Sequence, residues 1–198
     1  MIGKMFRVSA LAALAFAAFT ATASAQSTMK FGAVAGVDFS NLTGSDVSGL
    51  SSKTGFAGGL YAGFPMGKSV VIEPELLYVN KGAKDNTISP NQTLSINYIE
   101  IPVLVRYNFN PAGGPFLLLG PSVGFSTSCN FSSGGATADC KGLGADVQTT
   151  FAGVVGLGFQ KNRFGLEGRY DFDFGSAFKT SNAKNAVWEI LARIGFNK

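Results

Sequence analysis

The chain has 198 residues and a formal net charge of +4; 46% of its residues are hydrophobic, 14% are charged and none is histidine. Soluble domains are usually about one quarter charged, so this composition suits a fully water-exposed surface poorly. The absence of histidine excludes Ser-His-Asp hydrolysis, histidine-dependent lipid deacylation and the common histidine-containing metal sites.

The first 25 residues have the pattern of a signal peptide. Lys4 and Arg7 precede an apolar run at 10–19, and the small residues Ala-Ser-Ala at 23–25 form a cleavage site. We therefore expect residues 1–25 to be removed, although a retained anchor is the alternative, and residues 26–198 to form one domain. Loss of Lys4 and Arg7 from 16 basic residues leaves a small excess over the 12 acidic ones, so no nucleic-acid partner is indicated. No later apolar run is long enough to predict a transmembrane helix.

The remaining chain contains eight segments in which apolar residues alternate with small or polar ones. This period of two predicts β-strands that have one apolar face each. The predicted strands are 29–39, 56–64, 70–81, 95–109, 116–126, 147–160, 164–174 and 187–196.

The segment 95–109 has the clearest alternation. From Ile99 to Phe109 every odd position is apolar, whereas the even positions include Glu100 and Arg106. Before Ile99 the apolar positions have the opposite parity, as at Ile96 and Tyr98. We therefore predict a β-bulge near Tyr98, or that the residues before it rise above the lipid.

The connections alternate between short and long. The short ones, at 65–69, 110–115 and 161–163, contain Pro, Gly or Asn and predict tight turns. The long polar ones are 40–55, 82–93, 127–146 and 175–186. Strands joined in this order predict an all-β, eight-stranded antiparallel up-and-down barrel, and strands of about ten residues suit a tilted membrane crossing.

Such a barrel can face its apolar side in either direction. A soluble lipocalin-like barrel turns it inward around a ligand, and an outer-membrane barrel turns it toward lipid. The other faces are mostly Gly, Ala, Val, Ser and Thr, which pack well in a narrow interior but solubilise a surface poorly. Aromatic residues also gather near strand ends, as in the girdles of membrane barrels. The pattern favours a transmembrane β-barrel, integral to the bacterial outer membrane.

This topology orients the chain. We expect both termini and the three tight turns to face the periplasm and the four long loops to face outside. Cys129 and Cys140 both lie in the third long loop. In an exported chain, an even pair this close predicts a loop-closing disulfide rather than a redox or metal site.

Three stretches resemble the small outer-membrane barrels of the PorT-like family, which is widespread in Bacteroidota. They are Gly-Phe-Ala-Gly-Gly-Leu-Tyr-Ala-Gly-Phe at 55–64, Ile-Glu-Pro-Glu-Leu-Leu-Tyr-Val-Asn-Lys-Gly at 72–82 and Tyr-Ile-Glu-Ile-Pro-Val-Leu-Val-Arg-Tyr at 98–107. The resemblance spans nearly all of 26–198. It implies an eight-stranded barrel in the size class of OmpA and OmpX and an outer-membrane address. It implies little about activity, since only a few members are tied to protein secretion.

Ten charged residues are expected on inward faces, where mixed acids and arginines form a lumen-filling network because unpaired buried charges are costly. They are Glu73, Glu75, Glu100, Arg106, Glu167, Arg169, Asp171, Asp173, Glu189 and Arg193. We predict no catalytic residue, no cofactor and no metal ligand among them. Five loop lysines are candidates for contacts with outer-leaflet phosphates, or are simply solvated: Lys53, Lys84, Lys141, Lys179 and Lys184.

The expected function is that of a non-enzymatic envelope protein, either structural or contacting a surface or secretion partner through its outer loops. A narrow small-solute channel and, less favoured, a soluble periplasmic lipocalin-like carrier are the alternatives. The expected partners are outer-membrane lipids and lipopolysaccharide, the barrel assembly machinery during biogenesis, and a protein at the outer loops.

Overall fold

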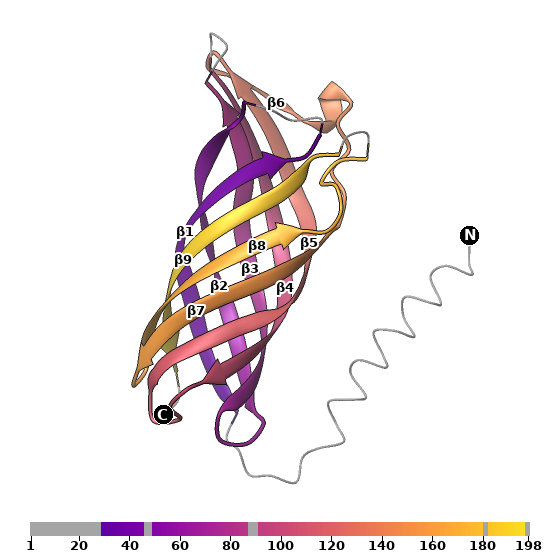
Figure 1. Cartoon of the computed structure of the whole chain (residues 1–198). Coiled ribbons are helices and arrows are strands. Elements are labelled where there is room, and N and C mark those ends of the chain that lie inside the picture. Colours follow the sequence, from indigo (N-terminus) through magenta and orange to yellow (C-terminus); the bar gives the residue numbers. More distant parts are fainter. Residues whose placement is uncertain (1–28, 46–48, 87–90, 180–181, 197–198) are drawn as a thin grey trace, which may run out of the picture.

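The computed structural model describes residues 29–45, 49–86, 91–179 and 182–196. The predicted signal peptide, 1–25, lies outside these described residues. Within them the chain forms a tall barrel closed by a single antiparallel sheet (Figure 1). No helix in the described ranges has the length and apolar character needed to cross a membrane.

Eight of the strands in the described residues form the barrel wall. They are β1 (Lys30–Thr43), β2 (Ser51–Pro65), β3 (Val70–Asp85), β4 (Gln92–Asn108), β5 (Gly114–Ser133), β7 (Thr150–Lys161), β8 (Phe164–Asp173) and β9 (Lys184–Gly195). Consecutive wall strands pair in order, and pairing of β1 with β9 closes the sheet so that the wall has no free edge. The short strand β6 (Ala136–Asp139) pairs only with the far end of β5, and the 3-10 helix η1 (Lys141–Leu143) follows it. The predicted eight-stranded up-and-down barrel is confirmed.

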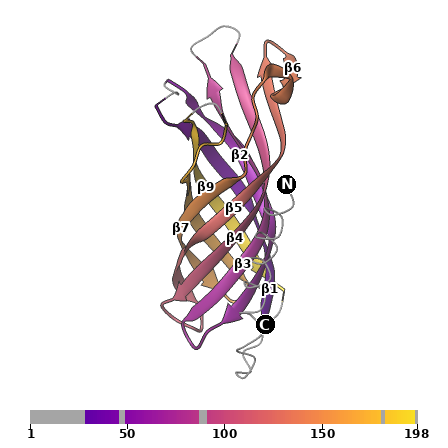
Figure 2. The ribbon, with the colours of Figure 1, turned by 90° about the vertical axis from the view of Figure 1, so that its right-hand side faces the viewer.

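The three tight turns lie at one end of the barrel, here called the turn end, and the opposite end is called the loop end. At the loop end the predicted boundaries were wrong, because much of the expected long loops is strand. β1 continues to Thr43, β3 to Asp85 and β5 to Ser133, while β4 begins at Gln92. Polar Ser, Thr and Asn residues mark solvent exposure, not the absence of strand pairing. Figure 2 shows that β4, β5 and β6 rise higher than β7.

The outer face of the barrel carries the apolar side chains. On β7, Phe151, Val155 and Leu157 are 64%, 45% and 66% exposed, whereas the alternate residues Ala152 and Val154 are buried. This orientation is the reverse of a lipocalin-like barrel, whose apolar faces enclose a ligand. Large exposed aromatic residues lie along the same face: Phe39, Tyr107, Phe109, Phe125, Phe159, Phe174 and Trp188. The barrel therefore presents an apolar belt suited to lipid.

A register irregularity occurs at the level predicted for Tyr98, but in the neighbouring strand. Asn97 pairs with Ser128 and Tyr98 with Ser126, so Thr127 is the extra residue and the bulge lies in β5. β4 keeps its alternation, and both Ile96 and Tyr98 are fully buried. The predicted bulge is thus present at the level of Tyr98, although in β5 and not in β4, and the interior toward the loop end accepts the apolar side chains of Ile96 and Tyr98. The alternative, that the residues before Tyr98 rise above the lipid, stays a prediction.

Candidate functional site

The interior near the turn end holds a compact set of ion pairs. Arg169 donates hydrogen bonds of 2.6 and 2.7 Å to the two carboxylate oxygens of Glu75 and a third, of 2.6 Å, to Glu167. Arg193 donates to Glu167 and to Glu73, each at 2.7 Å. All five side chains are at most 3% exposed. Each carboxylate therefore contacts a guanidinium, which offsets the cost of burying its charge.

Inward-facing glycines leave the space that these large side chains occupy. A Cβ on Gly32 would lie 2.3 Å from the ring of Tyr61, and one on Gly165 would lie 2.8 Å from Cγ of Arg193. The Tyr61 ring in turn lies 4.3 Å from the Arg193 guanidinium, within cation–π range. Small residues on the inner face thus allow a narrow barrel to enclose arginines.

Toward the loop end, Lys81 is the centre of a second set. Its ammonium lies 2.6 Å from Glu100 and 3.0 Å from Asp171. Nearby, Asp173 accepts a 2.6 Å hydrogen bond from the side chain of Asn185. Lys81 was missed as a network member, although its parity in β3 matches that of Glu75.

This second set, around Lys81, contains more hydrogen-bond acceptors than donors. Within the described residues, both carboxyl oxygens of Asp38 and one of Glu189 are buried without a hydrogen-bond partner. Lys53, expected as a loop lysine for phosphate contacts, is only 5% exposed and instead donates to Asn80. That expectation for Lys53 was wrong, because β2 extends into the predicted loop and turns Lys53 inward.

The structure places all ten predicted charged residues inside the barrel, where none exceeds 7% exposure. Nine belong to the two sets above or lie beside them; Arg106 lies closer to the turn end. The sequence-based prediction omitted Asp38, Lys53 and Lys81 from the interior. For Asp38 and Lys81 the alternation did indicate an inward position, because both lie on the non-apolar face of their strands. In the part of the chain that the structure describes, no group of three or more His, Cys, Asp or Glu residues is arranged to hold a metal ion.

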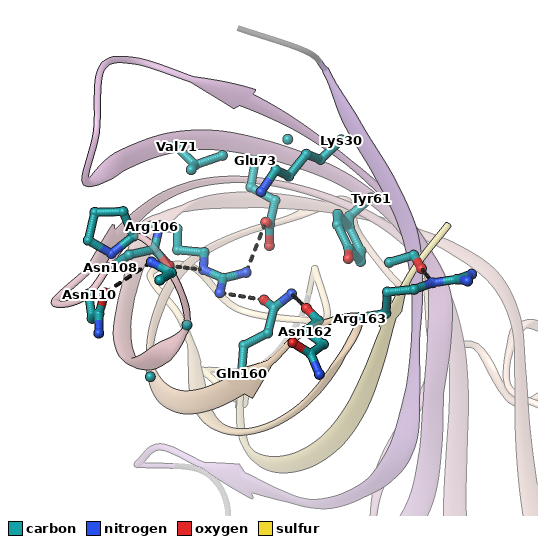
Figure 3. A pocket seen from close by; sticks show the side chains of 16 residues that line it. Lys30, Tyr61, Val71, Glu73, Arg106, Asn108, Asn110, Gln160, Asn162 and Arg163 are labelled. Carbon is teal, nitrogen blue, oxygen red and sulfur yellow. Dashed lines mark hydrogen bonds and ion pairs between the residues drawn. The ribbon is translucent and has the colours of Figure 1, made fainter. Parts of the chain in front are cut away.

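A cavity of about 590 Å³ opens at the turn end of the barrel (Figure 3). Its lining includes the charged residues Lys30, Glu73 and Arg106, together with amide side chains such as Gln160. At the loop end a smaller cavity, of about 260 Å³, is mostly apolar and includes Leu94 in its lining. The interior between them is occupied by the ion-pair sets.

The predicted disulfide between Cys129 and Cys140 is confirmed, joining residues 11 apart in the sequence. It ties the start of η1 to β5, and both cysteines pack against Ile96 and Tyr98. The far end of β5, together with β6 and η1, projects beyond the wall and is here called the β5–β6 arm. The bridge therefore braces this arm against the barrel wall.

A closed antiparallel barrel with an apolar outer belt and a charged interior is an integral outer-membrane β-barrel, so its belt faces outer-membrane lipid and lipopolysaccharide. Residues 23–179 match the outer membrane protein beta-barrel domain, and the chain belongs to that family. The predicted outer-membrane localisation is confirmed.

Solved structures share this fold at low sequence identity. Neisserial surface protein A (NspA) is 14% identical with a TM-score of 0.57, over 86% of this chain and 100% of its own. Ail, the attachment invasion locus protein of Yersinia pestis, is 16% identical with a TM-score of 0.53, over the same shares. A second Ail structure contains the heparin analogue sucrose octasulfate and has a TM-score of 0.51 at 15% identity, over 86% of this chain and 100% of that one. No curated protein matches the sequence significantly.

Proposed function

We propose that this protein is a non-enzymatic outer-membrane barrel that acts through its outer surface, and that its interior charges serve to hold the barrel together. The single observation that carries the proposal is the bidentate contact of Arg169 with Glu75 across the interior. Side chains fill the interior of eight-stranded barrels, and here they are held by strong charge-assisted bonds. Such a filled interior favours a structural role over a narrow small-solute channel.

Conductance separates these two functions. The purified full chain in a planar bilayer is expected to give no stable single-channel steps, whereas steps of constant size would favour the channel. The double variant Glu75→Ala with Arg169→Ala serves as the comparison, because it removes the crossing side chains. Steps in that variant alone would support the filling role, and identical steps in both proteins would contradict it.

The active surface is then the loop end, where the disulfide-braced β5–β6 arm projects. Its exposed side chains include Thr137 and Lys141. Lys179, on the connection between β8 and β9, is hydrogen-bonded to Asp146, which follows η1 in the chain. Ail, which has the same fold, has been solved with a heparin analogue. For the present chain we propose contacts with lipopolysaccharide phosphates or with a protein partner, and we assign the chain to the PorT-like group on the three sequence stretches that resemble it.

Crosslinking in intact cells tests this surface. A photoreactive residue in place of Thr137 is expected to give a discrete adduct with one envelope protein or with lipopolysaccharide. The matched control replaces Lys68, an exposed residue in a tight turn at the opposite end. Equal adducts from both positions, or none from Thr137, would contradict an interaction through the outer loops. We expect the barrel assembly machinery to appear only as a transient adduct during biogenesis.

A further inference from the structure

The cavity at the turn end contains an arginine that no carboxylate neutralises by hydrogen bonding. Arg106 lies 3.7 Å from Glu73, beyond hydrogen-bond distance, and Glu73 already accepts a 2.7 Å bond from Arg193. By contrast, Arg169 and Arg193 each donate to two carboxylates. Arg106 is nevertheless only 7% exposed, so its charge is buried with one long ion pair, to a carboxylate that Arg193 also contacts.

Neutral amides hold Arg106 in place. Its Nε donates a 2.9 Å bond to Asn108, and its Nη2 donates to Gln160. Both amides are themselves bonded to turn backbone, Asn108 to the carbonyl of Ser69 and Gln160 to that of Asn162. The guanidinium also lies 3.9 Å from the centroid of the Phe116 ring. In the described residues Nη1 makes no hydrogen bond, and its contact is the 3.7 Å ion pair with Glu73 that Figure 3 marks with a dashed line. This end of a rigidly held guanidinium therefore has a longer contact than the two nitrogens bonded to the amides.

The remaining charges around this cavity are mostly positive. Lys30 continues the inward row of β1 and extends over the cavity near Glu73 (Figure 3). Arg163 also contributes to the lining but donates to the carbonyl of Gly195. The two guanidiniums of Arg169 and Arg193 bond three carboxylates, those of Glu73, Glu75 and Glu167, which leaves one negative charge for Arg106. The positive charge of Lys30 is then in excess of the acids around the cavity. A site with an ordered guanidinium and a nearby ammonium suits an oxyanion.

We propose that this cavity binds a small oxyanionic ligand from the periplasmic side, with Arg106 and Lys30 contacting the anion. The volume of about 590 Å³ lies within the range of small-molecule sites and exceeds what a single inorganic anion needs. The amides of the lining donate and accept hydrogen bonds, which suits the polar body of a peptide-sized ligand. The anion is therefore a carboxylate on such a molecule or a phosphate, and the site is independent of the proposed outer-surface function.

The test uses the full protein in lipid nanodiscs and three probes. N-acetyl-alanyl-alanine carries a free carboxylate, its C-terminal amide has the same shape without the charge, and inorganic phosphate supplies the other oxyanion. Binding is followed by NMR through the Arg106 Nε–H signal and the side-chain amide of Gln160. The acid, phosphate or both are expected to shift these signals and to compete with each other, whereas the amide leaves them unchanged. Binding by the acid alone identifies a carboxylate site, and binding by phosphate alone identifies a phosphate site.

Substitutions assign the contact to the cavity. Arg106→Gln is expected to weaken binding at least tenfold, because it removes a buried charge that contacts the anion. Lys30→Gln removes an exposed charge, leaves the ion-pair sets intact and is expected to weaken binding about threefold to fivefold. Lys68→Gln removes the same charge at the same end but outside the lining, and should bind as the parent does. Failure of both oxyanions to bind, or equal affinity in the Lys30→Gln and Lys68→Gln variants, would overturn the proposal.

Discussion

Arg169 on β8 contacts Glu75 on β3 through two hydrogen bonds of 2.6 and 2.7 Å, although 94 residues separate them. In the closed strand order, β3 and β8 lie four strands apart in either direction. The pair therefore joins opposite walls of the barrel. Both side chains are fully or almost fully buried, so neither charge has an alternative partner in bulk water.

Breaking this pair should destabilise the barrel strongly. Glu75→Ala leaves Arg169 with Glu167 as its remaining hydrogen-bonded carboxylate, and removal of one partner from a buried pair typically costs about 3–5 kcal/mol. The free energy of unfolding can be followed in urea by the fluorescence of Trp188, the single tryptophan, whose ring centroid lies 4.6 Å from that of Tyr170.

The paired variant Glu75→Leu with Arg169→Met is the control for this measurement. Because it removes both charges while keeping volume, it should lose less stability than Glu75→Ala. If Glu75→Ala unfolds at the same urea concentration as the parent, the pair contributes nothing to stability.

The apolar belt should reject a charge in its middle. Val155 lies midway between Phe151 and Phe159 on the outer face of β7 and is 45% exposed. Val155→Arg is expected to cost about 2–4 kcal/mol of unfolding free energy in lipid vesicles, as lipid-facing arginines do near the bilayer midplane. Leu143→Arg, also at an exposed apolar residue but on η1 outside the wall, should change stability little. Equal costs at the two positions would contradict the membrane placement.

Loss of the disulfide should affect the projecting arm more than the barrel. Closing a loop between residues 11 apart is worth about 3 kcal/mol in the chain-entropy description. Both the parent and the variant Cys129→Ser with Cys140→Ser are expected to change gel mobility on heating, as a folded barrel does, because every wall pairing remains in the variant. Trypsin should cleave it faster after Lys141, and a cleavage rate equal to that of the parent would show that the bridge does not constrain the arm.

A surface ion pair near the same arm sets a pH dependence. Lys179 donates a 2.9 Å hydrogen bond to Asp146, and this bond lowers the pKa of the Asp146 carboxyl from its ordinary value. Since the folded pKa is the lower one, the contact stabilises the folded connection above the unfolded pKa and is lost as pH falls through the folded pKa. In an NMR titration, Lys179→Met should raise the midpoint of Asp146. An unchanged midpoint would contradict this contact in solution.

The turn end of the barrel was predicted from sequence almost to the residue. β2 ends at Pro65 and β3 begins at Val70, as the expected turn at 65–69 requires. Turn formation by Pro, Gly and Asn depends on local backbone preferences, which are legible in a short window of sequence. The loop end was predicted poorly, since pairing of polar strands such as the far ends of β4 and β5 depends on the neighbouring strand.

The sequence by itself determined which residues of each strand share a face, because the side-chain period of two is a local property of extended backbone. The small, weakly charged residues of the other face then favoured lipid contact for the apolar one. The sequence placed Glu73 and Glu75 in one inward row but carried no information on their partners. Only closure of the barrel, with its particular stagger between strands, brought Arg193 to Glu73 and Arg169 to Glu75. The same stagger left Arg106 beside a carboxylate that was already engaged, which makes the turn-end cavity a property of the tertiary structure alone.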